Sequence, residues 1–216
     1  MRRLNGFRAT LLGALAFAAA SSAVQLPPPI ELPKPKLDNT TTLIQALKAR
    51  KTGREFAPDA LPLQTLSDLL WAAFGVNRDD GRRTAPSAKN WQEIDIYVAL
   101  PQGVYLFDGK AHALVGVVAG NLRAATGMQA FVKDAPASLV FVADLARMKD
   151  ASAADRDLYS ATDAAFISQN VYLYCAAAGL TTGVRGYVDR PALAKAFGLR
   201  GDQRIILAQS VGYPKK

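Results

Sequence analysis

The stretch DAAFISQNVYLYCAAAGLTTGVRGY, residues 163–187, joins a helical pattern with little polar surface to a glycine-rich turn and a strand. The spacing predicts a helix over 163–178, because apolar side chains fall on every side of it and Gly179 follows as a stop signal. A helix that is apolar all round has to be buried in a protein core or in a subunit interface. A strand near 180–184 follows the helix directly.

Outward from this stretch, helices and strands are mixed along the chain. Further helices are expected over 40–50, 63–74, 122–132 and 191–197, and strands over 94–100, 104–107, a run that ends at 118, 138–143 and 204–211. Asp108-Gly109 is typical of a tight hairpin turn between antiparallel strands. A mixture of helices with an antiparallel hairpin predicts an α+β fold.

The N-terminus has the pattern of a secretory signal peptide over residues 1–23. Three arginines come first, an apolar run over 9–20 follows, and small residues end at Ala23. The apolar run is shorter than the roughly 20 residues that a spanning helix needs. We therefore expect a cleaved leader, a periplasmic or secreted location, and no membrane contact after cleavage; Arg2-Arg3 does not decide the export route.

Residues 24–39 contain five prolines, which predicts an extended arm rather than a helix. The arm is either a spacer or a segment that wraps over a partner. Residues 40–216 then form one domain. Removal of the three leader arginines lowers the formal charge from +8 to +5, which permits an anionic ligand. The sequence has no basic stripe interleaved with aromatics, so a nucleic-acid partner is not expected.

The scarcity of cysteine and histidine limits the kinds of catalytic and metal site that the chain can form. The chain has one cysteine, Cys175, and one histidine, His112, so it lacks the ligands of a Cys/His zinc site and forms no intrachain disulfide. A nucleophilic serine or cysteine would need His112 as its base, and His112 follows the hairpin turn, where an exposed surface side chain is expected. Difficult chemistry would therefore come from a bound cofactor.

Three motifs carry candidate binding residues. The first is Arg50-Lys51-Thr52-Gly53-Arg54, in which cations and a hydroxyl suit a phosphate; a helix C-terminus with dipole-complementing cations is an equal alternative. The second is Pro86-Ser87-Ala88-Lys89-Asn90, where an amide before a strand suits the edge of a heterocycle; an ordinary capped turn is the alternative.

The third motif is the run 179–187, whose glycines allow the backbone to lie flat against a planar ligand. An ordinary helix-to-strand turn with a bulge is the alternative for this run alone.

In this order and at this spacing, the three motifs together resemble the FMN-dependent nitroreductase family. That family carries an Arg-x-Ser/Thr-x-Arg/Lys run near its start, a Pro-Ser-x-x-Asn run before a strand, and a Gly-Leu run with glycines after a long helix. The similarity spans about residues 40–214. Pro-Ser-Ala, the Tyr-Val strand and the Gly-Val-Tyr hairpin are most similar to the branch of azoline-oxidising dehydrogenases that mature peptides.

The resemblance implies a homodimeric flavoprotein with a central, mostly antiparallel sheet flanked by helices and two FMN sites at the subunit interface. Arg50, Thr52 and Arg54 would hold the phosphate and the polar edge of the flavin. The partner subunit would supply the residues that line the ring, which are Pro86, Ser87 and Asn90.

The same resemblance places a backbone N–H of the glycine-rich run towards the reactive flavin nitrogen. The residues beside the ring would be Gly183, Val184, Arg185 and Gly186. The family often ends with a basic residue at the phosphate, for which Lys215 or Lys216 is available. Arg185 stands where many members have an acidic residue, so the site would be more positive and would favour an anionic substrate.

The resemblance implies an oxidoreductase that passes hydride or electrons through FMN to or from a small molecule, with no catalytic side chain strictly required. An azoline-type peptide dehydrogenase, a non-enzymatic flavin-binding protein and a structural dimer without flavin stay open as alternatives. Nicotinamide donors are not expected outside the cytoplasm, so the sequence leaves the electron donor and acceptor open.

Overall fold

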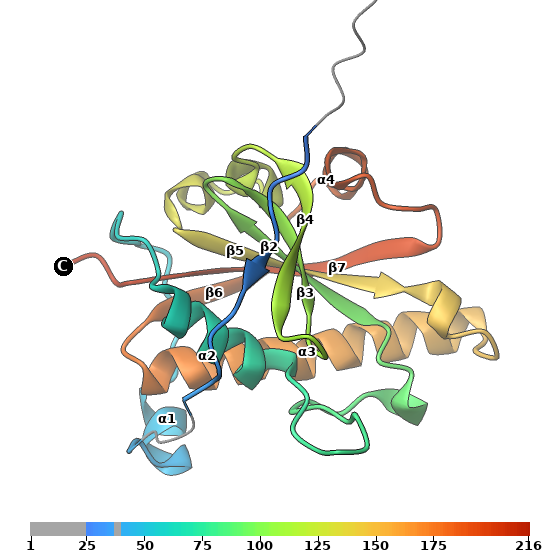
Figure 1. The fold of residues 1–216 in the computed structure, drawn as a ribbon, viewed down its shortest axis with the longest axis horizontal. Helices are drawn as coiled ribbons and strands as arrows, with labels where there is room; N and C mark the ends of the chain where they lie inside the picture. The colour runs from blue at the N-terminus through green and yellow to red at the C-terminus, as the bar shows by residue number, and fades with distance from the viewer. Residues whose placement is uncertain (1–24, 37–39) are drawn as a thin grey trace, which may run out of the picture.

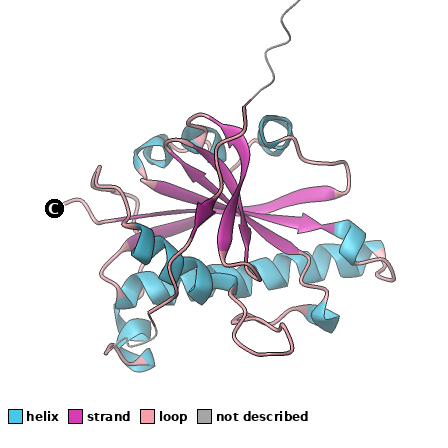
Figure 2. Cartoon of the chain, viewed as in Figure 1, coloured by secondary structure: helices cyan, strands magenta, loops and turns pink. Residues whose placement is uncertain are grey.

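A computed structural model of the protein describes residues 25–36 and 40–216. Seven antiparallel strands form one sheet in the order β1-β4-β3-β2-β5-β7-β6, with helices on both faces (Figures 1 and 2). The strands are β1 (Ile30–Glu31), β2 (Ile94–Leu100), β3 (Gly103–Asp108), β4 (Ala113–Ala119), β5 (Ala137–Asp144), β6 (Thr181–Arg185) and β7 (Gln203–Gly212). The helices are α1 (Leu43–Ala49), α2 (Leu63–Phe74), α3 (Ala153–Ala177) and α4 (Arg190–Phe197).

Successive side chains of the central strands point to opposite faces of the sheet, which divides the core into two layers. Ile94, Ile96 and Val98 pack with α2 and α3 in one cluster, whereas Tyr97 and Ala99 pack with α4 in the other. Figure 1 shows α1, α2 and α3 on one side of the sheet and α4 on the opposite side. Because both faces of the central strand β5 are covered, all eight of its residues are buried. The predicted α+β sheet flanked by helices is confirmed.

The observed bounds of α2 and β2 agree with the prediction to the residue. The predicted helix over 122–132 is wrong. Two 3₁₀ turns, η2 (Arg123–Thr126) and η3 (Ala130–Asp134), flank the extended Gly127 there, and the N–H of Met128 donates to the carbonyl of Tyr187. The hydrogen bond from Met128 to Tyr187, just after β6, therefore takes the place of a hydrogen bond within a helix.

Helix α3 begins ten residues before its predicted start, because Ser152 caps it by accepting a hydrogen bond from the N–H of Asp155. The helix also has an exposed side in the single chain, where Phe166 is 44% exposed. The C-terminal part of α3 is thus core on one face only.

The N-terminal arm lies on its own chain. Strand β1 pairs with β4, and the N–H of Lys36 donates to Asp68 on α2. The prediction of a purely exposed His112 is wrong: its ring is half-buried, and its Nε2 lies 2.7 Å from Oγ of Ser67. Ser67 donates to the carbonyl of Pro33, so this Ser–His pair fastens the arm instead of forming a nucleophile and its base.

The predicted signal peptide over 1–23 and residues 24 and 37–39 of the arm lie outside the described residues. None of the helices in the described part of the chain combines the length and the apolar composition that a membrane crossing needs.

Candidate functional site

Tyr172 on α3 joins the first and third motifs. Its hydroxyl accepts a hydrogen bond from the backbone N–H of Val184 at 3.0 Å and lies 2.9 Å from Oγ1 of Thr52. The guanidinium of Arg50 stacks over the same ring, 5.3 Å from its centre. A buried tyrosine hydroxyl needs polar partners, and here they are the two predicted binding segments.

Glycine allows these segments to approach each other. The N–H of Gly53 donates to the carbonyl of Thr182 at 2.9 Å, so the chain after α1 lies along the free edge of β6. A Cβ atom at Gly183 would stand 2.8 Å from the carbonyl oxygen of Gly53. Any side chain at 183 would therefore push the two motifs apart.

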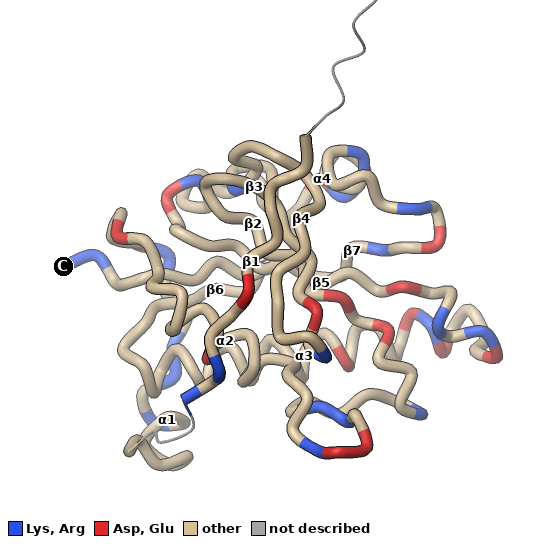
Figure 3. Tube along the Cα trace, in the orientation of Figure 1, with Lys and Arg blue, Asp and Glu red and all other residues tan. Residues whose placement is uncertain are grey.

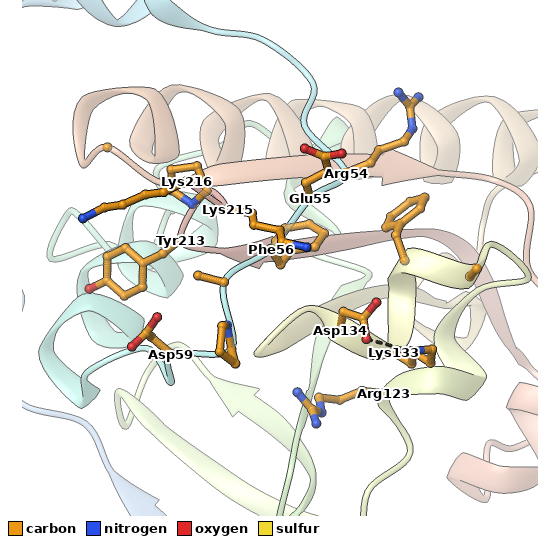
Figure 4. Close-up of a pocket in the computed structure, with 16 residues that line it drawn as sticks. Arg54, Glu55, Phe56, Asp59, Arg123, Lys133, Asp134, Tyr213, Lys215 and Lys216 are labelled. Carbon is orange, nitrogen blue, oxygen red and sulfur yellow. Dashed lines mark hydrogen bonds and ion pairs between the residues drawn. The ribbon is translucent and has the colours of Figure 1, made fainter.

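The C-terminus borders the same segment. Phe56 forms a bridge with Pro214, and the N–H of Lys215 donates to the carbonyl of Glu55 at 3.3 Å. Arg54 and Lys215 therefore extend from neighbouring pieces of backbone. Both line an open cleft of about 1600 Å³, which Phe131 also lines. Figure 4 shows Arg123 across the cleft from Arg54 and Lys215.

Cations outnumber acids around this cleft. It is lined by five cationic residues and three acidic residues, namely Arg54, Arg123, Lys133, Lys215 and Lys216 against Glu55, Asp59 and Asp134. Lys133 is paired with Asp134 at 2.9 Å, and burial lowers the pKa of Arg123, which donates to the carbonyl of Ala135. Figure 3 shows the basic C-terminal end of the chain. The exposed Arg54 and Lys215 are thus available to an anionic group such as a phosphate.

The second motif lies elsewhere in the single chain. Pro86, Ser87 and Asn90 line a separate cleft of about 400 Å³. The N–H of Ala88 donates to Asp163, which precedes Tyr172 by nine residues on α3, so the two groups are separated by about 14 Å along the helix. Within one chain, the second motif does not join the other two.

The loop of the second motif is strained. Lys89, Asn90 and Gln92 all have φ near +50°, a left-handed conformation that costs a residue other than glycine about 1–3 kcal/mol. The N–H of Gln92 donates to Oγ of Ser87 at 2.8 Å, which holds the loop closed. Strain of this kind persists only where the surroundings over-determine the conformation, and it gathers at functional sites.

Two buried carboxyl groups lie under this loop. Glu93 and Asp163 are both at most 2% exposed, and Oγ of Ser87 donates to Oε2 of Glu93. Desolvation, with the charge of Asp163 adding to it, raises the pKa of Glu93 to about 7. Oε1 of Glu93 has no hydrogen-bond partner in the described part of the chain.

The structure places Arg185 differently from the other predicted residues. Its side chain is 6% exposed and lies inside the fold, against Thr126, Ser138 and Ser210, so it does not line the cleft. The expectation that this guanidinium faces a substrate is therefore wrong, because β6 turns it towards the layer that holds η2. Gly183 and Val184 lie at the edge of the sheet beside the first motif, and Gly186 follows the end of β6.

The sequence reading missed Tyr172, which it treated only as part of an apolar helix. A tyrosine among apolar residues signals a hydroxyl in need of a partner, but nothing local indicates that the partners are Thr52 and Val184. Phe56 and Phe131, whose rings lie 6.2 Å apart in the cleft, were also missed.

The fold and site define an α+β protein with a cationic, partly aromatic cleft beside a glycine-rich sheet edge. The nitroreductase family model matches residues 47–213. A crystal structure of a candidate nitroreductase from Ralstonia eutropha is 45% identical, with a TM-score of 0.84, over 87% of this chain and 90% of that one. The chain belongs to the nitroreductase family.

Two more distant structures share the fold. The Escherichia coli microcin synthetase McbBCD complex, with truncated pro-MccB17 bound, has a TM-score of 0.70 at 18% identity, over 94% of this chain and 79% of that one. The NADPH:FMN oxidoreductase of Vibrio harveyi, complexed with NAD⁺, has a TM-score of 0.61 at 19% identity, over 81% of this chain and 69% of that one.

Proposed function

We propose that the protein is an FMN-dependent oxidoreductase that passes hydride or electrons to or from a small molecule. Family membership supports an oxidoreductase. The observation that carries the cofactor proposal is the Tyr172 junction, because it brings Thr52 and Arg50 to the edge of β6. Cations for a phosphate and a flat glycine-containing edge for a ring then lie side by side.

The residues present fit FMN. A phosphate needs cations and donors that outnumber nearby acids, and Arg50, Thr52, Arg54 and Lys215 outnumber Glu55 here. The ring needs a surface without side chains, and Gly186, directly after β6, offers one, because a Cβ there would meet nothing closer than 3.9 Å. In this proposal the four polar residues hold the phosphate and the polar edge, Gly183 lets the first motif approach β6, and Gly186 supports the ring.

The N–H of Val184 donates to Tyr172, so another N–H has to serve the ring. Backbone groups of a strand alternate in direction, and this alternation, continued one residue past the end of β6, would turn the N–H of Gly186 to the same side. Gly186 is therefore the proposed donor to the reactive ring nitrogen. When bound, FMN would supply a two-electron carrier, so the chain itself would need to orient the partners and exclude water.

We further propose a homodimer in which the strained 86–90 loop of one subunit completes the site of the other. Leu43, Ile44 and Leu47 of α1 are each at least 47% exposed, and α3 exposes Phe166. Burial of these side chains against a second copy would bring both loops towards a shared interface. Light scattering on the purified protein tests this, with a doubled mass as the expected result.

An azoline-type peptide dehydrogenase is the second candidate within the same class. It is favoured by the cleft, whose volume of about 1600 Å³ exceeds the roughly 300–1000 Å³ of most small-molecule pockets. The structural likeness to a complex with a bound peptide precursor agrees with that reading. With the predicted leader, either activity would operate in the periplasm or outside the cell.

The visible absorption spectrum of the purified protein, with and without added FMN, tests the proposal. Flavin bands that bleach under anaerobic reduction and return with an acceptor are expected. Bands that bleach but fail to turn over with any quinone, nitroaromatic or azoline peptide would indicate a flavin-binding protein without enzymatic activity. A colourless protein that ignores FMN would overturn the proposal.

A further inference from the structure

Arg185 is a buried cation surrounded only by neutral oxygens. It is the only lysine or arginine among residues 25–36 and 40–216 that is buried. Its guanidinium donates to the carbonyl and Oγ1 of Thr126 at 3.2 and 2.8 Å. It also donates to Oγ of Ser210 at 2.8 Å and to Oγ of Ser138 at 3.4 Å.

No ion pair between described residues includes this guanidinium. Burial lowers the pKa of Arg185 to about 10, which still leaves it protonated at neutral pH. A buried charge without a counter-charge destabilises a fold, and buried charges are normally paired. The missing counter-charge therefore points to a negative group outside residues 25–36 and 40–216.

The position of Arg185 identifies where that group would lie. Arg185 ends β6, one residue after Val184, whose N–H meets Tyr172, and one residue before Gly186. Its acceptor Ser210 pairs with Gly183 across the β6–β7 ladder, so the charge lies under the part of the edge that faces the proposed ring site. Coulomb interactions are weakly screened in such a dry interior.

We propose that Arg185 is a redox-tuning residue, whose buried charge raises the reduction potential of the bound flavin. This inference rests on the proposed function. Two electrons and one proton added to the flavin ring leave it with one negative charge, and a nearby fixed cation stabilises that charged form over the neutral oxidised form. The protein would then favour withdrawal of electrons from its substrate, a direction that suits a compartment without nicotinamide donors.

A purely structural role for Arg185 is the competing explanation. The guanidinium ties Thr126 to β5 and β7, and a Cβ atom at Gly127 would collide with it. This anchors the segment that carries Arg123 and Phe131 into the cleft. Such a tie depends on hydrogen bonds, whereas redox tuning depends on charge, and the two are separable by experiment.

The test compares the two-electron potential of bound FMN in four proteins, each equilibrated anaerobically with a reference dye. Arg185→Gln removes the charge and keeps hydrogen-bonding capacity. Ser210→Asp keeps Arg185 and places a carboxylate against it. Ser138→Ala removes the hydrogen bonds of Ser138 to Arg185 and Ser210 and keeps the charge, as the matched control beside the wild type.

Arg185→Gln and Ser210→Asp are each expected to weaken binding of reduced relative to oxidised FMN about tenfold, which is a potential about 30 mV lower for a two-electron couple. Ser138→Ala is expected to stay within twofold of the wild type. The inference is overturned if Ser210→Asp binds FMN with an unchanged potential, or if Ser138→Ala lowers the potential as much as the charge changes do.

If Arg185→Gln does not fold, the potential of FMN bound to Ser210→Asp decides the test. A wild-type protein that binds no FMN refutes the proposed function itself, whereas a flavin-loaded protein whose potential ignores all three substitutions refutes only the role of Arg185.

Discussion

Substitution of the buried Glu93 by glutamine should remove a pH-dependent loss of stability. Glu93 is fully buried beside Asp163 and accepts a hydrogen bond from Ser87. Glutamine has nearly the same shape as the protonated acid and, like it, carries no charge beside Asp163. Glu93→Gln therefore keeps the contacts of the acidic form at every pH.

The magnitude follows from the raised pKa. An ordinary glutamate has a pKa of 4.5, and burial raises that of Glu93 to about 7 in the folded chain. Its stabilising contribution is therefore complete below pH 4.5 and is lost as the pH rises through 7. At about 1.4 kcal/mol for each tenfold change in proton affinity, the loss is about 3 kcal/mol.

Urea unfolding at pH 5 and pH 8 measures this difference. The free energy of unfolding of Glu93→Gln, relative to wild type, should rise by about 2.5 kcal/mol between the two pH values, because part of the effect is already lost at pH 5. Glu31→Gln on the exposed strand β1 is the matched control and should follow wild type. Parallel pH profiles for wild type and Glu93→Gln would refute the assignment of a raised pKa to this carboxyl group.

Four further predictions concern the site and the arm. Tyr172→Phe leaves Thr52 and the N–H of Val184 without their shared partner, so we expect a loss of about 1–3 kcal/mol in urea unfolding; an unchanged midpoint would contradict this junction. Gly183→Ala should lower the melting temperature and weaken FMN retention, whereas Gly201→Ala, where a Cβ meets nothing within 4 Å, should change neither. Lys215→Ala should weaken FMN binding, measured by fluorescence titration, and leave riboflavin binding unaffected; equal weakening of both would remove Lys215 from the phosphate site. Ser67→Ala removes the tie to Pro33 and His112, so limited proteolysis should cut the arm faster while the domain stays intact, and an unchanged rate would argue against this tie.

The sequence predicts best where a single element carries its own signal. The predicted bounds of helix α2 equal the observed ones because an apolar stripe begins after Pro62 and ends before Gly75. Segment 122–132 has a comparable apolar content, but the tie of Met128 to Tyr187 and the hydrogen bond of Arg185 to Thr126 override its local preference. No local pattern contains those partners, which lie about 60 residues further on.

In the candidate site, too, local signals were predictable from the sequence and long-range contacts were not. The residue types of the first and third motifs indicate a phosphate and a planar ligand, and the structure brings both motifs together. The junction itself links Thr52 to a tyrosine 120 residues away, a distance over which helical and strand periodicity carry no information. The burial of Arg185 likewise depends on which face β6 turns to its neighbours, and this is fixed by its pairing with β7.

Other parts of the chain cover both edges of the sheet that β2 to β7 form. The arm pairs with β4 on one side, while Gly53 and Tyr172 occupy backbone groups of β6 on the other. An exposed edge strand can pair with a strand of another molecule, which leads to aggregation. The residues that shape the ligand site therefore also guard solubility, so a variant that loosens the Tyr172 junction would be prone to self-association before it unfolds.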